Sequence, residues 1–469
     1  MVKLEQMRVL MQDQSVLILG LGKTGKEVAL LLKERGAKVE ITEIAENQRI
    51  LRRKKELELK GIKVFIGPHE KVLLKNKTLL VLSPGVRLDL PIVKKARSMG
   101  IPVIGELEII TRFIPKENLI AITGTNGKTT TSFLTYKILK KSKANVKLGG
   151  NIGIPLSRLI RTSNFNDPSF KIVMEVSSFQ LETTDNFSPH IYAILNVAPD
   201  HLDRHFSMER YLNIKSSPLT RMSSDDVAIL NCDQDQVAHL TKLTEAKVIF
   251  FSHRKNPEAN LFIDNKSLVA NIGGHFVRIY IGDLDLKKFH SLDNLLCAVG
   301  IALIEGIDAE IVHKALVEYK PLAHRQQLIA KIKGVNFIDD SKATNEAAVE
   351  ALIKTLDTPA ILIMGGRDKG GDFSSLRKYF PGNVKGIVLI GEAKDKIRRQ
   401  LEGTFPIRDC RTLGEAVRVS FSWSKKGDAV VLCPGCSSFD EFSSYKERGN
   451  KFKEEVKKLK EEIEKKTTG

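Results

Sequence analysis

Apolar and polar positions follow one another in regular blocks along most of this chain. Short runs rich in Val, Ile and Leu, such as VLILG at 16–20 and LIAIT at 119–123, alternate with longer stretches in which apolar residues recur every three or four positions. The short runs are typical of buried strands, and the longer stretches are typical of amphipathic helices. Strands that alternate with helices form parallel sheets covered by helices, so the pattern predicts an α/β protein.

The blocks form three consecutive series. The first begins with VLILG, the second with LIAIT and the third near GVNFIDD. Because 469 residues exceed what one hydrophobic core holds, we expect three tandem domains, at residues 1–106, 107–320 and 321–469. The second series also contains NLFIDNKSLVANIGGHFVRIYI, a β-rich stretch that predicts a small antiparallel part beside the parallel sheet.

Composition excludes several classes of protein. Hydrophobic residues make up 42% of the chain and charged residues 28%, which is ordinary for a folded protein. There is no run of about 18 apolar residues, so we expect no membrane insertion. The five cysteines are too few for a disulfide framework in a chain of this length, which indicates a reducing cytoplasm.

The formal net charge of +18 allows three interpretations. A basic surface can bind nucleic acid, attract small anionic substrates, or consist of lysine-rich solvated helices. The tail KFKEEVKKLKEEIEKK illustrates the last case, because Lys and Glu alternate there at helical spacing. No recognition helix, RNA-binding strand motif or zinc-finger spacing occurs, so we expect no nucleic-acid partner.

The first series opens with a GxGxxG turn formed by Gly20, Gly22 and Gly25, and Glu43 ends the next predicted strand. This pattern is typical of dinucleotide binding, in which backbone N–H groups and a helix N-terminus receive a diphosphate. Taken alone it favours NAD, although the glycines require only a bound diphosphate. Tight packing of the helix on the strand is the alternative explanation.

The second series opens with a stronger phosphate-binding pattern, LIAITGTNGKTTTSF at 119–133. The glycines Gly124 and Gly127 allow the backbone N–H groups to turn toward anionic oxygens, and a helix that we expect to begin at Lys128 adds its positive end. Lys128 offers positive charge, and Thr129 offers a hydroxyl for Mg²⁺. The common form of this loop has a glycine where this chain has Ile122. The pattern nevertheless predicts a site for the phosphates of ATP.

Two strand ends carry candidate metal ligands. Glu175 ends the apolar run KIVME, where a buried charge needs a cation or a partner. The stretch NVAPDHLDRH, which includes Asp200, His201, Asp203 and His205, follows another strand. Carboxylate oxygens suit Mg²⁺ better than imidazole does. We interpret the cluster as functional because ligands bind at this edge of parallel sheets.

The third series has polar loops after its strands. DDSKATN and MGGRDKGGDF place Asp340, Lys342, Thr344 and Lys369 at the corresponding sheet edge, where they either bind phosphate and carboxylate groups or are ordinary loop residues. The CPGC stretch at 433–436 lacks the helix start of a redox motif and the further ligands of a zinc site. We therefore expect its cysteines to pack in a turn.

These stretches, in this order, resemble the Mur ligase family, which builds the peptide stem of the bacterial cell wall. The resemblance extends from about residue 15 to residue 455. TGTNGKTT and NVAPDHLDRH are similar to motifs of the whole family. GGNIG, SSFQLE, DSKATN and CPGCSSFDEF followed by RG at 448–449 resemble the branch that adds D-glutamate.

The resemblance implies a fold and an activity. It implies a Rossmann-like N-terminal domain that holds UDP rather than NAD, a central ATP-binding domain of the P-loop type, and a Rossmann-like C-terminal domain for the incoming amino acid. It also implies a cytoplasmic, monomeric, ATP- and Mg²⁺-dependent amide ligase of peptidoglycan synthesis with an acyl-phosphate intermediate. The implied small-molecule partners are UDP-N-acetylmuramoyl-L-alanine and D-glutamate. A sister ligase for another amino acid, or a non-enzymatic nucleotide-binding switch, is the alternative.

The resemblance also implies roles for individual residues. Catalytic positions correspond to Lys128, Glu175, His201 and Lys215. Metal positions correspond to Thr129, Glu175, His201 and Lys215, the last of these as a carbamate. ATP positions correspond to Gly124, Thr125, Asn126, Gly127, Lys128, Thr129, Thr130, Asn294, Arg325 and Asp340. Positions for the UDP substrate correspond to Lys23, Thr24, Ser83, Pro84, Gly85 and Asn151, and those for D-glutamate to Thr344, Lys369, Ser438, Phe439 and Tyr445.

The chain departs from the family pattern at a few of these places. Ser291 follows His290 where the family has Asn, Gln327 replaces a Glu, and Tyr445 stands where Phe is usual. We expect these differences to alter individual contacts rather than the activity.

Overall fold

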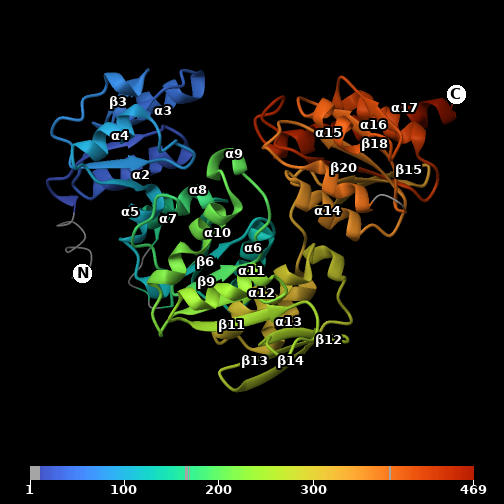
Figure 1. Cartoon of the computed structure of the whole chain (residues 1–469), viewed down its shortest axis with the longest axis horizontal. Coiled ribbons are helices and arrows are strands. Elements are labelled where there is room, and N and C mark those ends of the chain that lie inside the picture. Colours follow the sequence, from blue (N-terminus) through green and yellow to red (C-terminus); the bar gives the residue numbers. More distant parts are fainter. Residues whose placement is uncertain (1–10, 164–166, 168, 380–381, 469) are drawn as a thin grey trace. The chain divides into compact units, whose positions relative to one another are not determined.

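The computed structural model describes residues 11–163, 167, 169–379 and 382–468. It contains three α/β domains, each built on one sheet, as the sequence pattern predicted (Figure 1). Residue contacts group the chain into two compact units. One comprises Met1–Val197, Leu212–Asp285 and Ser291–Tyr319, and the other comprises Ala198–Tyr211, Leu286–His290 and Lys320–Gly469.

The N-terminal sheet has five parallel strands in the order β3-β2-β1-β4-β5, which is a Rossmann-like order. The strand order reverses between β1 and β4, and the GxGxxG turn follows β1 at this point. The strands are β1 (Ser15–Leu19), β2 (Lys38–Glu43), β3 (Lys63–Ile66), β4 (Leu79–Leu82) and β5 (Val103–Gly105). The helices are α2 (Lys23–Glu34), α3 (Gln48–Glu58), α4 (Pro91–Ser98) and α5 (Glu106–Thr111).

The central sheet has nine strands in the order β14-β13-β12-β11-β10-β9-β6-β8-β7. The seven strands from β7 to β12 are parallel, and β12, β13 and β14 form the expected antiparallel part. The strands are β6 (Leu119–Thr123), β7 (Val146–Gly150), β8 (Lys171–Glu175), β9 (Ile191–Ile194), β10 (Val227–Asn231), β11 (Lys247–Ser252), β12 (Leu261–Asp264), β13 (Ser267–Ile272) and β14 (His275–Tyr280). The longer helices are α6 (Lys128–Lys141), α7 (Leu156–Thr162), α10 (Met208–Ser216), α12 (Leu292–Ile304) and α13 (Ala309–Glu318), and α8 (Ser178–Leu181), α9 (Leu202–His205) and α11 (Asp235–Ala238) are short.

The C-terminal sheet has six strands in the order β15-β16-β20-β17-β18-β19, and only β15 is antiparallel to its neighbour. Successive residues of β17 face opposite sides. Leu362 and Met364 pack in one core, and Ile361 and Ile363 pack in the other. The strands are β15 (Gln327–Ile332), β16 (Val335–Asp339), β17 (Ala360–Gly365), β18 (Val384–Ile390), β19 (Ile407–Asp409) and β20 (Ala429–Gly435), and the helices are α14 (Glu346–Lys354), α15 (Lys394–Leu401), α16 (Leu413–Trp423) and α17 (Tyr445–Thr468).

None of the helices in the described part of the chain combines the length and the apolar character that crossing a bilayer requires. The longest, α17, contains the alternating Lys and Glu residues of the basic tail.

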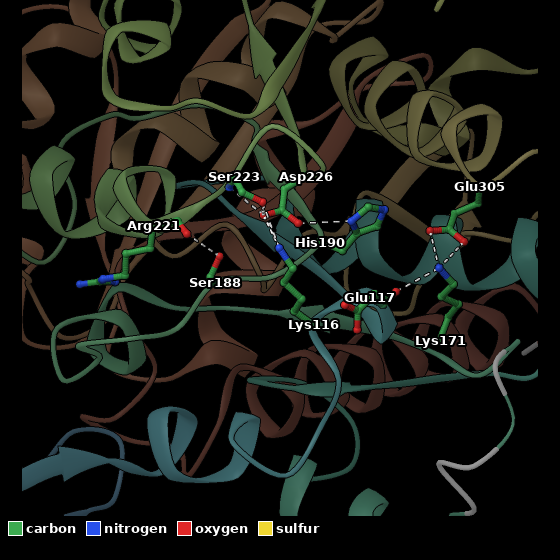
Figure 2. A network of polar contacts seen from close by, with 9 residues as sticks. All are labelled: Lys116, Glu117, Lys171, Ser188, His190, Arg221, Ser223, Asp226 and Glu305. Carbon is green, nitrogen blue, oxygen red and sulfur yellow. Dashed lines mark hydrogen bonds and ion pairs between the residues drawn. The ribbon is translucent and has the colours of Figure 1, made fainter. Parts of the chain in front are cut away.

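A network of ion pairs and hydrogen bonds joins the amino ends of the central strands (Figure 2). The buried Asp226, just before β10, accepts hydrogen bonds from Lys116 Nζ at 3.1 Å and Ser223 N at 2.9 Å, and it lies 3.3 Å from His190 Nδ1. Lys116 precedes β6 and His190 precedes β9, so one carboxylate links the starts of three adjacent strands. Although burial raises the pKa of Asp226, these hydrogen bonds hold it below its ordinary value.

We predict that Asp226→Asn lowers the free energy of unfolding at pH 7 by about 2–3 kcal/mol, because an amide cannot accept these charge-assisted hydrogen bonds as strongly. A carboxyl whose pKa is lowered by folding stabilises the fold above its ordinary pKa, and this contribution disappears as the pH falls through the lowered value. The difference between the two proteins in urea unfolding should therefore shrink toward pH 3. Glu310→Gln, in the exposed pair with Lys314, serves as the control and should change nothing measurable.

Candidate active site

The stretch TGTNGKTT forms a turn whose glycines adopt conformations that other residues avoid. Gly124 has φ +148° and Gly127 has φ +83°, and α6 begins at Lys128 as expected. A Cβ atom on Gly127 would lie 2.1 Å from Asn294 Oδ1, so this glycine also lets α12 approach the loop. Ile122, at the position of the missing glycine, is a buried residue of β6. The turn therefore starts later than in the common phosphate-binding loop.

The side chains of Lys128 and Asn196 hold this loop through four hydrogen bonds. Lys128 Nζ donates hydrogen bonds to Gly124 O at 2.8 Å and Thr125 O at 2.7 Å, so its ammonium group lies over the turn. The Asn126 N–H donates to Asn196 Oδ1 at 2.9 Å, and Asn196 Nδ2 donates to Asn126 O at 3.2 Å. A glycine turn, a lysine and a helix N-terminus together attract anionic oxygens.

Glu175 ends β8 with its side chain buried, and two polar groups contact it. Thr129 Oγ1 donates to Glu175 Oε2 at 2.7 Å, and Asn151 Nδ2 donates to Glu175 Oε1 at 2.9 Å. A carboxylate and a hydroxyl beside a phosphate-binding turn are the oxygen donors that Mg²⁺ prefers. These residues therefore fit a magnesium ion that neutralises phosphate charge.

Lys215, in α10, is also buried beside the loop. Its Nζ donates to Gly124 O at 2.8 Å, and its own carbonyl accepts a hydrogen bond from the Tyr192 hydroxyl at 2.6 Å. A carbamate on this nitrogen would carry negative charge in place of the ammonium group and become a metal ligand. The predicted partner of Lys215, His201, belongs to the other compact unit, where it has φ 55° and its Nε2 lies 3.7 Å from Asp200 Oδ2.

A cavity of about 140 Å³ contains four of the six residues predicted to hold the UDP substrate, namely Thr24, Ser83, Pro84 and Asn151. The other two, Lys23 and Gly85, do not line it. Lys23 Nζ donates to Gly153 O at 2.9 Å, and Gly85 has φ +89°. The remaining lining residues are Gly22 of the GxGxxG turn and three residues that the sequence analysis did not assign to the site, Glu106, Gly150 and Gln180.

The GxGxxG turn forms one wall of this cavity. A Cβ atom on Gly25 would lie 1.9 Å from Gly20 O, so α2 packs on the turn as closely as a glycine allows. Glu43 accepts hydrogen bonds from Leu21 N at 2.8 Å and Ala45 N at 3.0 Å. Its carboxylate thus holds the backbone of the turn, and Gly22 alone of the three glycines lines the cavity.

In the second unit, a small cavity contains Thr344 and Lys369, two of the residues predicted to contact D-glutamate. Lys369 Nζ lies 2.9 Å from Asp200 Oδ1, and Asn345 Nδ2 donates to Asp200 Oδ2 at 3.0 Å. Although burial raises the pKa of Asp200, Lys369 and His201 lower it to about 2. The cavity therefore has one ionised carboxylate paired with a lysine.

Asp340, predicted to contact ATP, is buried at the end of β16. Burial raises its pKa to about 7, although Arg325 acts in the opposite direction. Next to it, His324 Nδ1 lies 2.6 Å from Asp339 Oδ2. Burial and the nearby charge of Arg325 lower the pKa of His290 to about 4. Asp340 and His290 are therefore two groups of the second unit whose pKa values are strongly shifted.

The buried Arg448 of α17 organises the loops at the strand ends of the C-terminal sheet. Its guanidinium donates to Ser341 Oγ and Ser341 O at 3.0 Å, to Cys436 O at 3.1 Å and to Ser437 O at 3.2 Å. The sequence analysis did not assign this residue a role. Its five fixed N–H donors suit carbonyls from separate loops, which lysine cannot match.

The other residues predicted to contact D-glutamate lie near these loops without lining the cavity. Ser438 is buried, Phe439 is 62% exposed, and the ring of Tyr445 lies 4.4 Å from Lys342 Nζ. Cys433 and Cys436 are free thiols in the hydrophobic core, which confirms that they pack there. The expected turn is wrong for Cys433, because β20 extends through Gly435.

Comparison with known proteins identifies the class. Residues 14–105 match the model of the MurD-like N-terminal domain of Mur ligases, residues 122–302 match the Mur ligase middle domain, and residues 324–436 match the glutamate ligase domain. The chain belongs to the Mur ligase family, whose members are ATP-dependent amide ligases, and it is therefore an enzyme of that class.

Individual relatives of this chain share the name of one ligase activity. The chain is 37% identical over 445 residues to the UDP-N-acetylmuramoylalanine–D-glutamate ligase of Acidobacterium capsulatum, covering 94% of this chain and 96% of that protein. It is 38% identical over 443 residues to the ligase of the same name from Koribacter versatilis, with the same coverage of both chains. The fold is similar to that of MurF from Thermotoga maritima in complex with ADP, with a TM-score of 0.58 at 16% identity over 96% of each chain.

We predict that Arg448→Lys destabilises the C-terminal domain by about 2–4 kcal/mol, because one ammonium group cannot satisfy the buried carbonyls that the guanidinium reaches. Thermal unfolding followed by circular dichroism measures the loss. Arg418→Lys changes an arginine whose side chain is 43% exposed beside Glu462 and should leave the transition unchanged. If both variants lowered the unfolding temperature by the same small amount, Arg448 would not organise these loops.

Proposed function

We propose that this enzyme joins D-glutamate to UDP-N-acetylmuramoyl-L-alanine at the expense of ATP. The observation that carries the proposal is the Glu175 carboxylate, which contacts Thr129 of the phosphate-binding turn and Asn151 of the cavity assigned to the UDP substrate. A terminal phosphate bound at the turn and a substrate bound in the cavity would therefore be close to each other, with the Glu175 side chain between them. The relatives that carry the name of this activity support the choice of substrates.

The chemistry follows from what an amide bond requires. A carboxylate is a poor electrophile, so an amine does not displace its oxygen unaided. The alanyl carboxylate of the UDP substrate attacks the γ-phosphorus of ATP, and ADP leaves while an acyl phosphate forms. The amine of D-glutamate then attacks the acyl carbon and loses a proton, and inorganic phosphate leaves with the electrons of the C–O bond.

The first step brings two anions together, and the enzyme has to screen their repulsion. Lys128 and the N-terminus of α6 supply positive charge at the turn. Thr129 and Glu175 would hold Mg²⁺, which supplies further neutralisation of phosphate charge when bound. We assign His201 and a carbamylated Lys215 to a second metal site. Asn294, Arg325 and Asp340 complete the proposed nucleotide site.

The second step needs D-glutamate positioned with its amine free to attack. We assign this role to Thr344, Lys369, Ser438, Phe439 and Tyr445. Lys369, already paired with Asp200, offers a cation for a carboxylate of the amino acid. We further propose that the domains divide at residues 106/107, after the first residue of α5, and at residues 320/321. We also propose that the protein acts as a cytoplasmic monomer on small molecules.

Phosphate release from ATP tests the choice of substrates. In the presence of UDP-N-acetylmuramoyl-L-alanine, we expect release to require D-glutamate and to be absent with L-alanine, L-lysine or meso-diaminopimelate. Release with L-alanine and UDP-N-acetylmuramate would instead indicate a sister ligase. Failure of every acceptor would favour a non-enzymatic nucleotide-binding switch.

We predict that Lys128→Ala lowers turnover by about 10²–10³-fold, the scale for losing one preorganised charge stabiliser. Lys140→Ala removes an exposed lysine from the last turn of the same helix and is the matched control. Equal turnover of both variants in the phosphate-release assay would remove Lys128 from the mechanism.

For Lys215→Ala we predict a loss of turnover that a short carboxylic acid, added to the assay, partly restores. The acid would supply the carboxylate that a carbamate provides. Acetate and propionate should act in a concentration-dependent way on the variant and leave the unmodified enzyme unchanged. Full activity of the variant without added acid would show that no carbamate is needed.

A further inference from the structure

Two glutamates, Glu106 and Glu108, lie in the short helix α5, and their environments differ. Glu108 accepts hydrogen bonds from Arg112 Nη2 at 3.0 Å, Asn186 N at 3.0 Å and Asp185 N at 3.1 Å. Although burial raises the pKa of Glu108, these donors hold it below its ordinary value. Glu108 is therefore an ionised structural residue with its acceptors satisfied.

Glu106 is 6% exposed and lacks such donors. Its nearest polar partner is Gln180 Nε2, 3.4 Å from Oε1, and its Oε2 is buried without a hydrogen-bond partner among the described residues. The side chain lines the cavity that also contains Thr24, Ser83 and Asn151. A buried oxygen without a hydrogen-bond partner costs free energy, so its presence in a residue that lines a cavity points to a ligand.

The surrounding backbone fixes this arrangement. Gln180 Oε1 accepts from Ser177 N at 3.1 Å and Ser177 Oγ at 3.0 Å in a capping box, so the NH₂ group of Gln180 is the part that faces Glu106. The preceding Gly105 packs so closely that a Cβ atom there would lie 1.9 Å from Thr183 Oγ1. Glu106 Oε1 thus has one fixed donor, and Oε2 is left without a hydrogen-bond partner among the described residues.

Among the described residues, no other side chain that lines this cavity is charged. The polar ones come from α2 (Thr24), from the end of β4 (Ser83), from the turn after β7 (Asn151) and from α8 (Gln180), and all four are neutral. The nearby Lys23 donates instead to Gly153 O. Burial consequently raises the pKa of Glu106 to about 8, so the carboxyl is a neutral acid at pH 7 and has a proton to donate.

We propose that Glu106 binds the UDP-linked sugar as a neutral carboxylic acid, its carboxyl O–H donating a hydrogen bond to an oxygen of the sugar or diphosphate. This inference rests on the proposed function, because it takes the cavity as the site of that substrate. The ionised form would lack the proton and would repel a diphosphate in a buried site. Substrate affinity is therefore coupled to one proton on the enzyme.

The experiment titrates UDP-N-acetylmuramoyl-L-alanine into the full chain by calorimetry, without ATP, between about pH 6.5 and pH 8.5 in buffers of different ionisation enthalpy. A ligand that requires the protonated acid should bind about fourfold more weakly at the upper pH. Each binding event there should take up about three-quarters of a proton. Both quantities are measured on the unaltered protein and need no variant to fold.

Glu106→Gln keeps a donor of similar shape but cannot ionise, so its affinity should not vary over this range and its binding should take up no proton. Glu108→Gln is the matched control and should keep the pH dependence of the unaltered protein. Binding without proton uptake, or an unchanged pH dependence in Glu106→Gln, would overturn the role of Glu106. If no protein binds the UDP-sugar at any pH, the proposed function fails as well, which is a different result.

Discussion

The proposed active site depends on one buried carboxylate. Glu175 sits at the end of β8 with its side chain out of solvent, and it is shared by Thr129 at the start of α6 and Asn151 after β7. A charge in such a place is tolerated only with strong partners. Because those partners belong to the phosphate-binding turn and to the wall of the UDP-sugar cavity, this single interaction holds the two proposed substrate sites next to each other.

The parallel sheet explains why these groups converge. The carboxyl ends of parallel strands meet at one edge, so the loops after β6, β7 and β8 lie together although they are separated in sequence. The polar groups at the amino ends of the same sheet do not belong to the proposed site. There Asp226, Lys116 and His190 tie neighbouring strands together, and the polar groups serve stability.

Much of this organisation could be predicted from the sequence. Apolar runs alternating with helical stretches predicted three α/β domains, and the glycines predicted that α6 begins at Lys128. Glu106 could not be recognised, because its importance comes from neighbours distant in the chain. Arg448 falls in the RG pair of the family motif, but its hydrogen bonds to Ser341, Cys436 and Ser437 could not be predicted from the sequence. Nothing local indicates that Glu106 lacks a donor while Glu108, two residues later, has several.

The most direct test of the account is a crystal structure with Mg²⁺ and a non-hydrolysable ATP analogue. The account predicts that the β- and γ-phosphates lie on the backbone N–H groups between Gly124 and Thr129, beside Lys128, and that the cation binds Thr129 Oγ1 and Glu175. A nucleotide bound elsewhere, with Glu175 still closed on Thr129 and Asn151 and no cation beside it, would contradict the account.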